Sequence, residues 1–181
     1  PNRMAAALDN LVADRPAGRA GWYADARTAY LESLVPPPQP GDVDMGIITA
    51  QIQARLPADA IITHGAGNFS IWANKFMQYG RDQRLLGPQS GSMGFGLPAA
   101  LAAKAHDSGR FVLCFAGDGD FQMNGAELGT ALQAGLHPVI LILNNSSYGT
   151  IRMHQERAYP ARISGTEIVN PDYVALAGAY G

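Results

Sequence analysis

Two short polar motifs, each placed at the end of an apolar run, have the residue types needed to bind a metal ion and a phosphate group. Residues 117–119 read Gly-Asp-Gly, and residues 144–145 read Asn-Asn. Glycines allow tight turns and let backbone N–H groups approach an anion closely. Carboxylate and amide oxygens are hard ligands of the kind that Mg2+ takes, often together with a phosphate. Each motif alone is common in turns and loops, so the prediction depends on their lying close together.

The elements that must position these motifs alternate between strands and helices. Strands are predicted at residues 60–63, 84–86, 111–115 and 138–143. Helices are predicted at residues 22–34, 44–55, 69–79, 97–106 and 171–181, with one more after residue 124. This alternation predicts an α/β fold, a parallel sheet with helices on both faces. Ligands bind at the carboxyl ends of such strands. One strand–helix–strand crossover separates the two motifs, so we expect them to be neighbours there.

Three helix starts have residues suited to capping. Asp44 can cap the helix that runs to residue 55. Asn124 is the predicted N-cap of the next such helix, and Glu127, three residues later, completes a capping box. Asn170 is the predicted N-cap of the last helix, with Pro171 at its first position.

The proline-rich run at residues 36–40 marks the clearest boundary in the chain. Such a run favours extended backbone and makes a stiff linker. We therefore assign residues 1–41 to the end of a preceding domain and its linker, and residues 42–181 to a second domain. The chain begins with Pro1 rather than methionine, and a strand should follow its last helix. We therefore expect a longer protein, of which this chain is truncated at the C-terminus.

Composition excludes several classes of partner. The chain has 181 residues, of which 47% are hydrophobic and 15% charged, which is typical of a globular protein. A formal net charge of −2 gives no reason to expect nucleic acid or an anionic membrane as a partner. No apolar run is long enough to span a membrane. Cys114 is the only cysteine, so no internal disulfide can form, which favours a reducing compartment and a cytoplasmic localisation.

Together the two polar motifs resemble the signature of thiamine-diphosphate enzymes. That signature joins Gly-Asp-Gly to Asn-Asn through a spacer, which here comprises residues 120–143. The sequence Gly-Ser-Met-Gly-Phe-Gly-Leu-Pro-Ala-Ala at residues 91–100 is similar to the corresponding stretch of acetolactate synthases, as is Leu-Ile-Leu-Asn-Asn at residues 141–145. The resemblance covers residues 42–181, and residues 1–35 are similar to the tail of that family's middle domain.

The resemblance implies a thiamine-diphosphate-binding fold and a role for each matching residue. Asp118 and Asn145 would bind Mg2+ through their side chains, and Ser147 would bind it through its backbone carbonyl. The Gly91 carbonyl would accept a hydrogen bond from the aminopyrimidine, and Met93 would hold the cofactor bent. The expected cofactor-binding residues are Gly67, Asn68, Gly91, Met93, Gly117, Asp118, Gly119, Asp120, Asn145, Ser147 and Gly149. The expected substrate-pocket residues are Thr150, Ile151 and His154.

An acetolactate synthase-like enzyme decarboxylates a 2-keto acid and transfers the resulting carbanion to a second carbonyl. The resemblance therefore implies a small 2-keto-acid substrate and a homodimer or tetramer. The family's activating glutamate lies in a separate pyrimidine-binding domain, usually on a partner subunit. We therefore expect no catalysis from this chain alone. FAD, where the family carries it, would belong to the middle domain.

Some positions depart from the acetolactate synthase pattern. Asp120 replaces a small residue such as Ser or Ala, and we expect its carboxylate to point away from the diphosphate or to cap a neighbouring N–H. Asn68-Phe69 replaces a Gln-His pair, and Phe69 cannot donate a hydrogen bond to phosphate. His154 replaces a tryptophan that shapes the acceptor pocket. These changes preserve the expected cofactor and leave the reaction open.

Alternative functions remain open at this point. A simple 2-keto-acid decarboxylase or an acyl-transferring enzyme would use the same cofactor with a different acceptor pocket. A nicotinamide-dependent dehydrogenase is suggested by residues 65–70, but Ser70 replaces the third glycine of that fingerprint and the next strand end lacks a ribose-binding acid. A non-catalytic binding or regulatory subunit is a third class, which the retained Asp118 and Asn145 disfavour.

Overall fold

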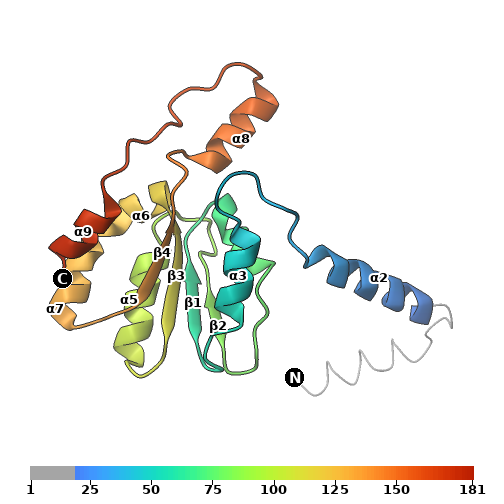
Figure 1. Cartoon of the computed structure of the whole chain (residues 1–181), viewed down its shortest axis with the longest axis horizontal. Helices are drawn as coiled ribbons and strands as arrows, with labels where there is room; N and C mark the ends of the chain where they lie inside the picture. The colour runs from blue at the N-terminus through green and yellow to red at the C-terminus, as the bar shows by residue number, and fades with distance from the viewer. Residues whose placement is uncertain (1–18) are drawn as a thin grey trace, which may run out of the picture. The chain divides into compact units, whose positions relative to one another are not determined.

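The computed structural model describes residues 19–181 and divides the chain into two compact units, residues 1–37 and 38–181. Within the described part, the first unit holds helix α2 (Arg19–Ser33), which overlaps the predicted helix at residues 22–34. All other described elements belong to the second unit (Figure 1). In residues 19–181, no helix is long and apolar enough to cross a membrane.

A four-stranded parallel sheet in the order β2-β1-β3-β4 forms the centre of the second unit. Its strands are β1 (Ile61–His64), β2 (Arg84–Leu86), β3 (Val112–Gly117) and β4 (Val139–Leu143). The register pairs Gly117 with Leu143 at the carboxyl ends of β3 and β4. Asp118 and Asn144 directly follow these two residues, so they lie side by side at the carboxyl ends of the strands. The predicted parallel sheet is confirmed.

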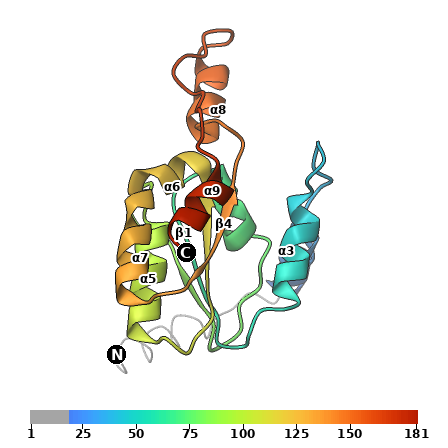
Figure 2. The same cartoon turned by 60° about the vertical axis from the view of Figure 1, so that its left-hand side comes forward.

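Helices cover both faces of this sheet, as the alternating sequence predicts (Figure 2). One face packs against α5 (Gly96–His106), α6 (Asp118–Asn124), α7 (Leu128–Ala134) and α9 (Tyr173–Ala179). The other packs against α3 (Met45–Gln53) and α4 (Ile71–Asn74). Strand β3 serves both cores, because Val112, Cys114 and Ala116 belong to the first and Leu113 and Phe115 to the second. This alternation follows from the two-residue period of a strand.

The helix predicted at residues 69–79 is shorter than expected. A 3-10 turn, η1 (Asn68–Ser70), leads into α4, which ends at Asn74. The chain then folds back, and the Tyr79 hydroxyl donates to the Ala73 carbonyl at 2.7 Å. Met77 is buried in the same core. The sequence after Asn74 therefore suits a folded-back segment, and the prediction of a helix to residue 79 was wrong.

Of the predicted caps, only Asp44 is confirmed. Its Oδ1 accepts from the N–H groups of Gly46 at 2.7 Å and Ile47 at 3.2 Å at the start of α3. Asn124 is not an N-cap with a capping box, because it ends α6 and makes no capping bond. A 3-10 turn, η2 (Gly125–Glu127), separates it from α7, and Glu127 accepts a hydrogen bond from the Thr130 hydroxyl.

The N-cap of α9 is Asp172 rather than Asn170. Its Oδ1 accepts from the N–H groups of Val174 at 2.9 Å and Ala175 at 3.0 Å. Helix α9 begins at Tyr173, so Pro171 precedes the helix instead of occupying its first position. Asn170 and Asp172 both have side chains that can cap a helix, and the aspartate makes the capping bonds while the asparagine binds Asp118 and Asn144.

Helix α8 (Gly149–Ala158) projects beyond the carboxyl ends of the strands in both views (Figure 1 and Figure 2). The stretches before and after it pair with each other. The Tyr148 N–H donates to the Thr166 carbonyl at 2.8 Å, and the Ile168 N–H donates to the Ser146 carbonyl at 2.9 Å. This pairing forms a stem that holds α8 above the strand ends.

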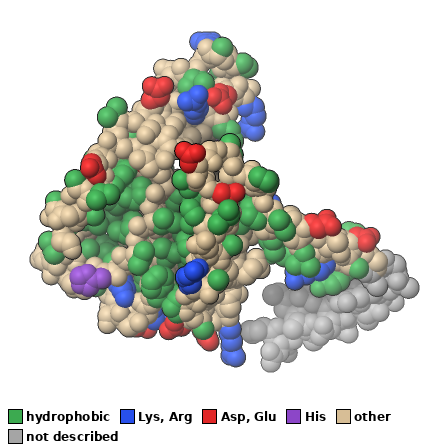
Figure 3. Space-filling model, viewed as in Figure 1, with side chains coloured by type: hydrophobic (Ala, Val, Ile, Leu, Met, Phe, Trp, Pro, Cys, Tyr) green, Lys and Arg blue, Asp and Glu red, His purple; other side chains and the backbone are tan. Residues whose placement is uncertain are grey.

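Strand β4 forms one edge of the sheet and is less buried than β1 and β3. Figure 3 shows hydrophobic side chains gathered on the face of the molecule that carries this edge. Val139, at the start of β4, is 47% exposed. The strand nevertheless keeps its register with β3, so the position of its polar carboxyl end is fixed.

Candidate functional site

A cavity of about 910 Å3 opens at the carboxyl ends of β1, β3 and β4. The predicted site residues that line it are Gly67, Asn68, Met93, Gly117, Asp118, Gly119, Asp120, Asn145, Ser147, Gly149, Thr150 and Ile151. The predicted residues Gly91 and His154 do not line it. The sheet topology thus brings together segments that are separated by more than 80 positions in the sequence.

Asp118 is the first residue of α6 and is only 2% exposed. Its Oδ2 accepts a hydrogen bond from Asn170 Nδ2 at 2.7 Å. In the described part of the chain, no hydrogen bond reaches Oδ1. Asp118 lines the cavity, and this oxygen is not among the buried side-chain atoms that lack a partner, so it is accessible from the cavity. A carboxylate oxygen that is accessible and accepts no hydrogen bond can bind a cation, so the carboxylate fits a metal ligand.

The two asparagines that follow β4 are used differently. Asn144 Oδ1 accepts from Asn170 Nδ2 at 2.8 Å and from the Ser146 N–H at 3.0 Å, which uses both of its lone pairs. Asn145 Oδ1 accepts from the Ser147 N–H at 3.1 Å and has a second lone pair for another partner. Asn145 is therefore the asparagine with capacity to bind a cation.

Asn170 joins these residues and was missed as a site residue by sequence reasoning. Its Nδ2 donates to Asp118, to Asn144 and, at 3.5 Å, to Ser146 Oγ, and its Oδ1 accepts from Gln122 Nε2 at 2.6 Å and from the Tyr173 hydroxyl at 3.0 Å. The side chain thereby links the ends of β3 and β4 to α6 and α9. The signal available in the sequence was the stronger cap at Asp172, which leaves the Asn170 side chain without a capping role.

Asp120 is 3% exposed, and its carboxylate binds backbone rather than lining the cavity as a free charge. Its Oδ1 accepts from the N–H groups of Ala66 at 3.0 Å and Gly94 at 2.8 Å. The expectation that it caps a neighbouring N–H is confirmed. Burial raises the pKa of this carboxyl, while the two N–H groups and the nearby His64 lower it by less. A Cβ on Gly65 would collide with the carboxylate, so glycine is required there.

Helix α8 is tied to the end of β1 by Asn68. The Asn68 N–H donates to Thr150 Oγ1 at 2.8 Å, and Asn68 Nδ2 contacts Met153 Sδ at 3.7 Å. His154 lies on the exposed surface of α8, with its Nδ1 at 3.1 Å from Arg157 Nη2. Thr150 and Ile151 thus lie at the cavity, and His154 lies outside it.

The family model described as "Thiamine pyrophosphate enzyme, C-terminal TPP binding domain" matches residues 65–181. The chain belongs to this family. Thiamine pyrophosphate is the same molecule as thiamine diphosphate. The match begins immediately after β1 and includes every strand end that lines the cavity. Residues 65–70 are therefore interpreted as a strand end of this family and not as a dinucleotide fingerprint.

Individual relatives agree with the family match. Over 145 residues, or 78% of this chain, it is 36% identical to acetolactate synthase isozyme 2 large subunit from Escherichia coli (strain K12). Over 128 residues, or 70% of this chain, it is 38% identical to acetolactate synthase large subunit from Parasynechococcus marenigrum (strain WH8102). The matched stretches make up 26% and 21% of those proteins, so the chain spans about a quarter of their length.

These findings confirm the resemblance to acetolactate synthases. The chain carries the thiamine pyrophosphate-binding domain of an acetolactate synthase-like enzyme, and its α/β fold with a parallel sheet places the family's strand-end segments around one cavity.

Proposed function

We propose that this chain binds the diphosphate of thiamine diphosphate through Mg2+, as part of an acetolactate synthase-like enzyme. The observation that carries the metal proposal is Asp118 Oδ1, which is accessible from the cavity and has no hydrogen-bond partner in the described part of the chain. Among residues 19–181, no three His, Cys, Asp or Glu side chains gather as a metal site. The ligand set is therefore one carboxylate completed by neutral oxygens, which suits Mg2+ held together with a phosphate.

The neutral oxygens come from the segment after β4. Asn145 Oδ1 has a lone pair left, and so does the Ser147 carbonyl, which within residues 19–181 accepts one hydrogen bond, from the Gly149 N–H at 2.8 Å. Backbone N–H groups in the first turn of α6, at Gly119 and Asp120, have no acceptor within the helix. They are the donors that we assign to the diphosphate, together with the backbone at Gly67 and Asn68.

When bound, thiamine diphosphate supplies the carbanion stabilisation, and the protein supplies position and electrostatics. We assign Met93 to the support of the bent cofactor and the Gly91 carbonyl to its aminopyrimidine. The reaction proposed is decarboxylation of a 2-keto acid followed by transfer to a second carbonyl. Thr150 and Ile151, which line the cavity, would shape the acceptor side, whereas His154 lies outside it. The activating glutamate would come from a pyrimidine-binding domain in a homodimer or tetramer, so this chain alone would be inactive.

Calorimetric titration of thiamine diphosphate, with and without Mg2+, tests the proposal. We expect binding that requires Mg2+ and is lost in Asp118→Ala. Asp107→Ala is the matched control, because the Asp107 carboxylate likewise accepts one hydrogen bond, from the Gly109 N–H at 3.2 Å, but lies in an exposed turn away from the cavity. Equal binding by Asp118→Ala and wild type, or binding that ignores Mg2+, would overturn the metal assignment.

The reaction is tested by the products formed from 2-keto acids in an enzyme that joins this chain to its pyrimidine-binding domain. A product with a new carbon–carbon bond supports carboligation. Release of the free aldehyde alone would instead identify a simple 2-keto-acid decarboxylase.

A further inference from the structure

We infer that helix α6 clamps Gly94 at both its N–H and its carbonyl and thereby fixes Met93 relative to Asp118. The clamp consists of Asp120 and Asn124. The inference rests on the proposed function for the roles of Met93 and Asp118. Its structural part, the immobilisation of Gly94 by α6, concerns only contacts within this chain.

The clamp has two hydrogen bonds to one residue. Asp120 Oδ1 accepts from the Gly94 N–H at 2.8 Å, and Asn124 Nδ2 donates to the Gly94 carbonyl at 2.9 Å. Asp120 and Asn124 are four positions apart, so they lie on one side of α6, one turn above the other. From this side of α6, Asp120 supplies the acceptor for the Gly94 N–H and Asn124 supplies the donor to the Gly94 carbonyl.

Packing leaves the clamped residue little freedom. Gly94 is buried and has a φ of +80°, which favours glycine. A Cβ at this position would lie 2.7 Å from both Asn124 Nδ2 and Met123 Cβ. The backbone of residue 94 thus touches α6 directly as well as through its hydrogen bonds.

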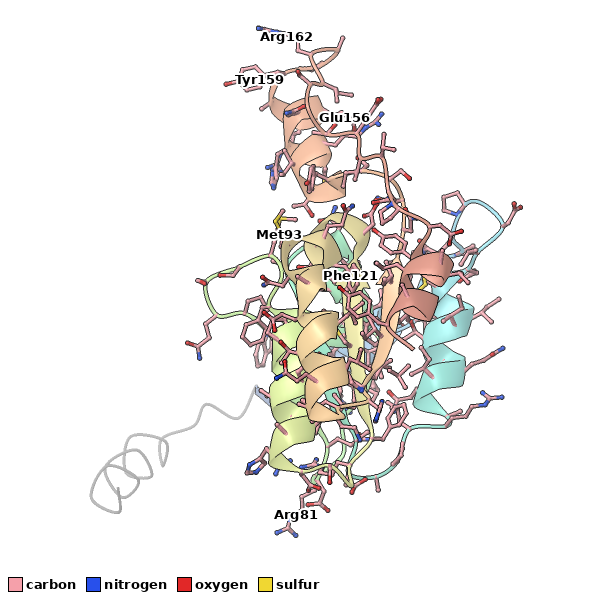
Figure 4. All side chains as sticks on the ribbon, turned by 90° about the vertical axis from the view of Figure 1, so that its left-hand side faces the viewer. Arg81, Met93, Phe121, Glu156, Tyr159 and Arg162 are labelled. Atoms are coloured by element: carbon pink, nitrogen blue, oxygen red, sulfur yellow. The ribbon has the colours of Figure 1, made fainter. Side chains whose placement is uncertain are left out.

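Met93 precedes the clamped residue and is half-buried at the cavity. In Figure 4 it lies at the end of the unit from which α8 projects, and Arg81 lies at the opposite end. Asp118 lines the same cavity and is the first residue of α6. One short helix thus carries the proposed metal ligand and also holds the segment that supports the cofactor rings.

The same oxygen of Asp120 also accepts from the Ala66 N–H at 3.0 Å, which ties the end of β1 to α6. A serine at position 120 has a side chain one bond shorter, so its hydroxyl would reach these two donors only if the backbone moved. The carboxylate also needs the space left by Gly65, whose Cβ would collide with it. The aspartate therefore acts as a positioning residue for two cofactor-binding segments, and Gly65 makes room for it.

Amide hydrogen exchange of the 181-residue chain, read residue by residue by NMR, tests the clamp without any cofactor. In Asp120→Ala we expect the Gly94 amide to exchange about ten to a hundred times faster, as loss of a hydrogen bond to a charged group predicts. Exchange at Cys114, in the central strand, reports global unfolding and corrects for lost stability. Asp120→Asn keeps an oxygen acceptor of the same reach and should retain most of the protection.

Asp44→Ala is the matched control for the exchange experiment. Asp44 also accepts from two backbone N–H groups, at the start of α3, so its loss should lower global stability without exposing Gly94 selectively. Asn124→Ala should loosen Gly94 as Asp120→Ala does. Selective Gly94 exposure in both clamp variants supports the inference, and exposure that merely follows Cys114 in every variant overturns it.

Binding measurements separate this inference from the proposed function. With Mg2+ present, Asn124→Ala should weaken thiamine diphosphate binding about tenfold but leave inorganic pyrophosphate binding within about twofold, because only the ring support is loosened. Equal loss for both ligands, or no loss for either, would overturn the positioning role of the clamp. If wild type binds neither ligand, the proposed function fails, while the exchange experiment still decides whether α6 holds Gly94.

Discussion

Replacement of Asn170 by alanine should destabilise the chain more than its partial exposure suggests. The substitution removes the donor to Asp118 Oδ2 at 2.7 Å, and Asp118 is only 2% exposed. Loss of a hydrogen bond to a buried charged group costs about 1.5–3 kcal/mol. Asn144 and Gln122 are exposed, so water can replace their lost partner at a cost within about 0.5 kcal/mol each. We therefore expect the free energy of unfolding to fall by roughly 2–4 kcal/mol.

Urea denaturation followed by circular dichroism measures this change. Gln155→Ala is the control, because Gln155 also makes two amide hydrogen bonds, with the Ser164 carbonyl at 3.0 Å and the Ser164 N–H at 2.9 Å. Ser164 is exposed, so water should limit the cost to about 1 kcal/mol. Equal losses in the two variants would refute the reasoning that burial of Asp118 sets the cost.

Replacement of Asn170 by aspartate supplies a further test of the charge at this position. The variant places a second carboxylate beside that of Asp118, so like-charge repulsion adds to the lost hydrogen bond. We expect it to be less stable than Asn170→Ala without Mg2+ and to regain more stability when Mg2+ is added. An identical Mg2+ response in the two variants would contradict a metal site at Asp118.

Three other perturbations test separate parts of the structure. Gly94→Ala should lower the free energy of unfolding by roughly 2–4 kcal/mol in urea denaturation, because the residue has a positive φ and its new Cβ would collide with α6. Gly135→Ala is the control: its φ is +62° but its Cβ would meet open space, so it should lose only about 1 kcal/mol. Burial raises the pKa of the Cys114 thiol from 9.0 to about 11, so the unfolded chain ionises first. The stability contribution is complete below pH 9 and falls by roughly 3 kcal/mol as pH rises through 11, a slope that Cys114→Ala should lack in denaturation at stepped pH. Thr150→Val removes the acceptor for the Asn68 N–H, and limited proteolysis should then cut α8 several times faster than in wild type, with little change in global stability.

Sequence patterns predicted the sheet well because β3 and β4 are continuous apolar runs, and the shorter β1 and β2 each hold two adjacent large apolar residues before a glycine-containing segment. The Asp44 cap was also predictable, since its hydrogen bonds reach only two and three residues along the chain. The expectation that Asp118 and Asn145 lie close together rested on a similar rule, because the parallel topology places successive strand ends side by side, and both residues line one cavity. Their role as metal ligands stays a prediction. A residue's position could thus be predicted from the sequence where its hydrogen-bond partner was a few residues away or where the order of the strands fixed its neighbours.

The failures involve side chains whose partners are distant. Asn124 has the residue type of an N-cap, yet its amide binds a carbonyl 30 positions earlier. Asn170 looks equally suited to capping, and its amide binds a carboxylate 52 positions earlier. An asparagine side chain can accept from a nearby backbone N–H or donate to a distant oxygen. Which of the two it does depends on the packing of the folded chain, so the residue type alone does not predict it.

The structure gives Phe69, a departure from the acetolactate synthase pattern, a packing role beside the cavity. As a replacement for histidine it lacks a donor for phosphate, but its ring lies against two glycine backbones that border the cavity. A Cβ on Gly67 or on Gly117 would lie 2.7 Å from the ring. The ring therefore covers these two backbones, and the donors that we propose for the diphosphate come from the backbone. Phe69→His restores a donor in a similar volume, so it should tighten binding of Mg2+–pyrophosphate severalfold in calorimetry while costing about 1 kcal/mol of packing. Weaker binding in this variant would show that the aromatic ring, through the glycine backbones it covers, is itself needed to shape the diphosphate site.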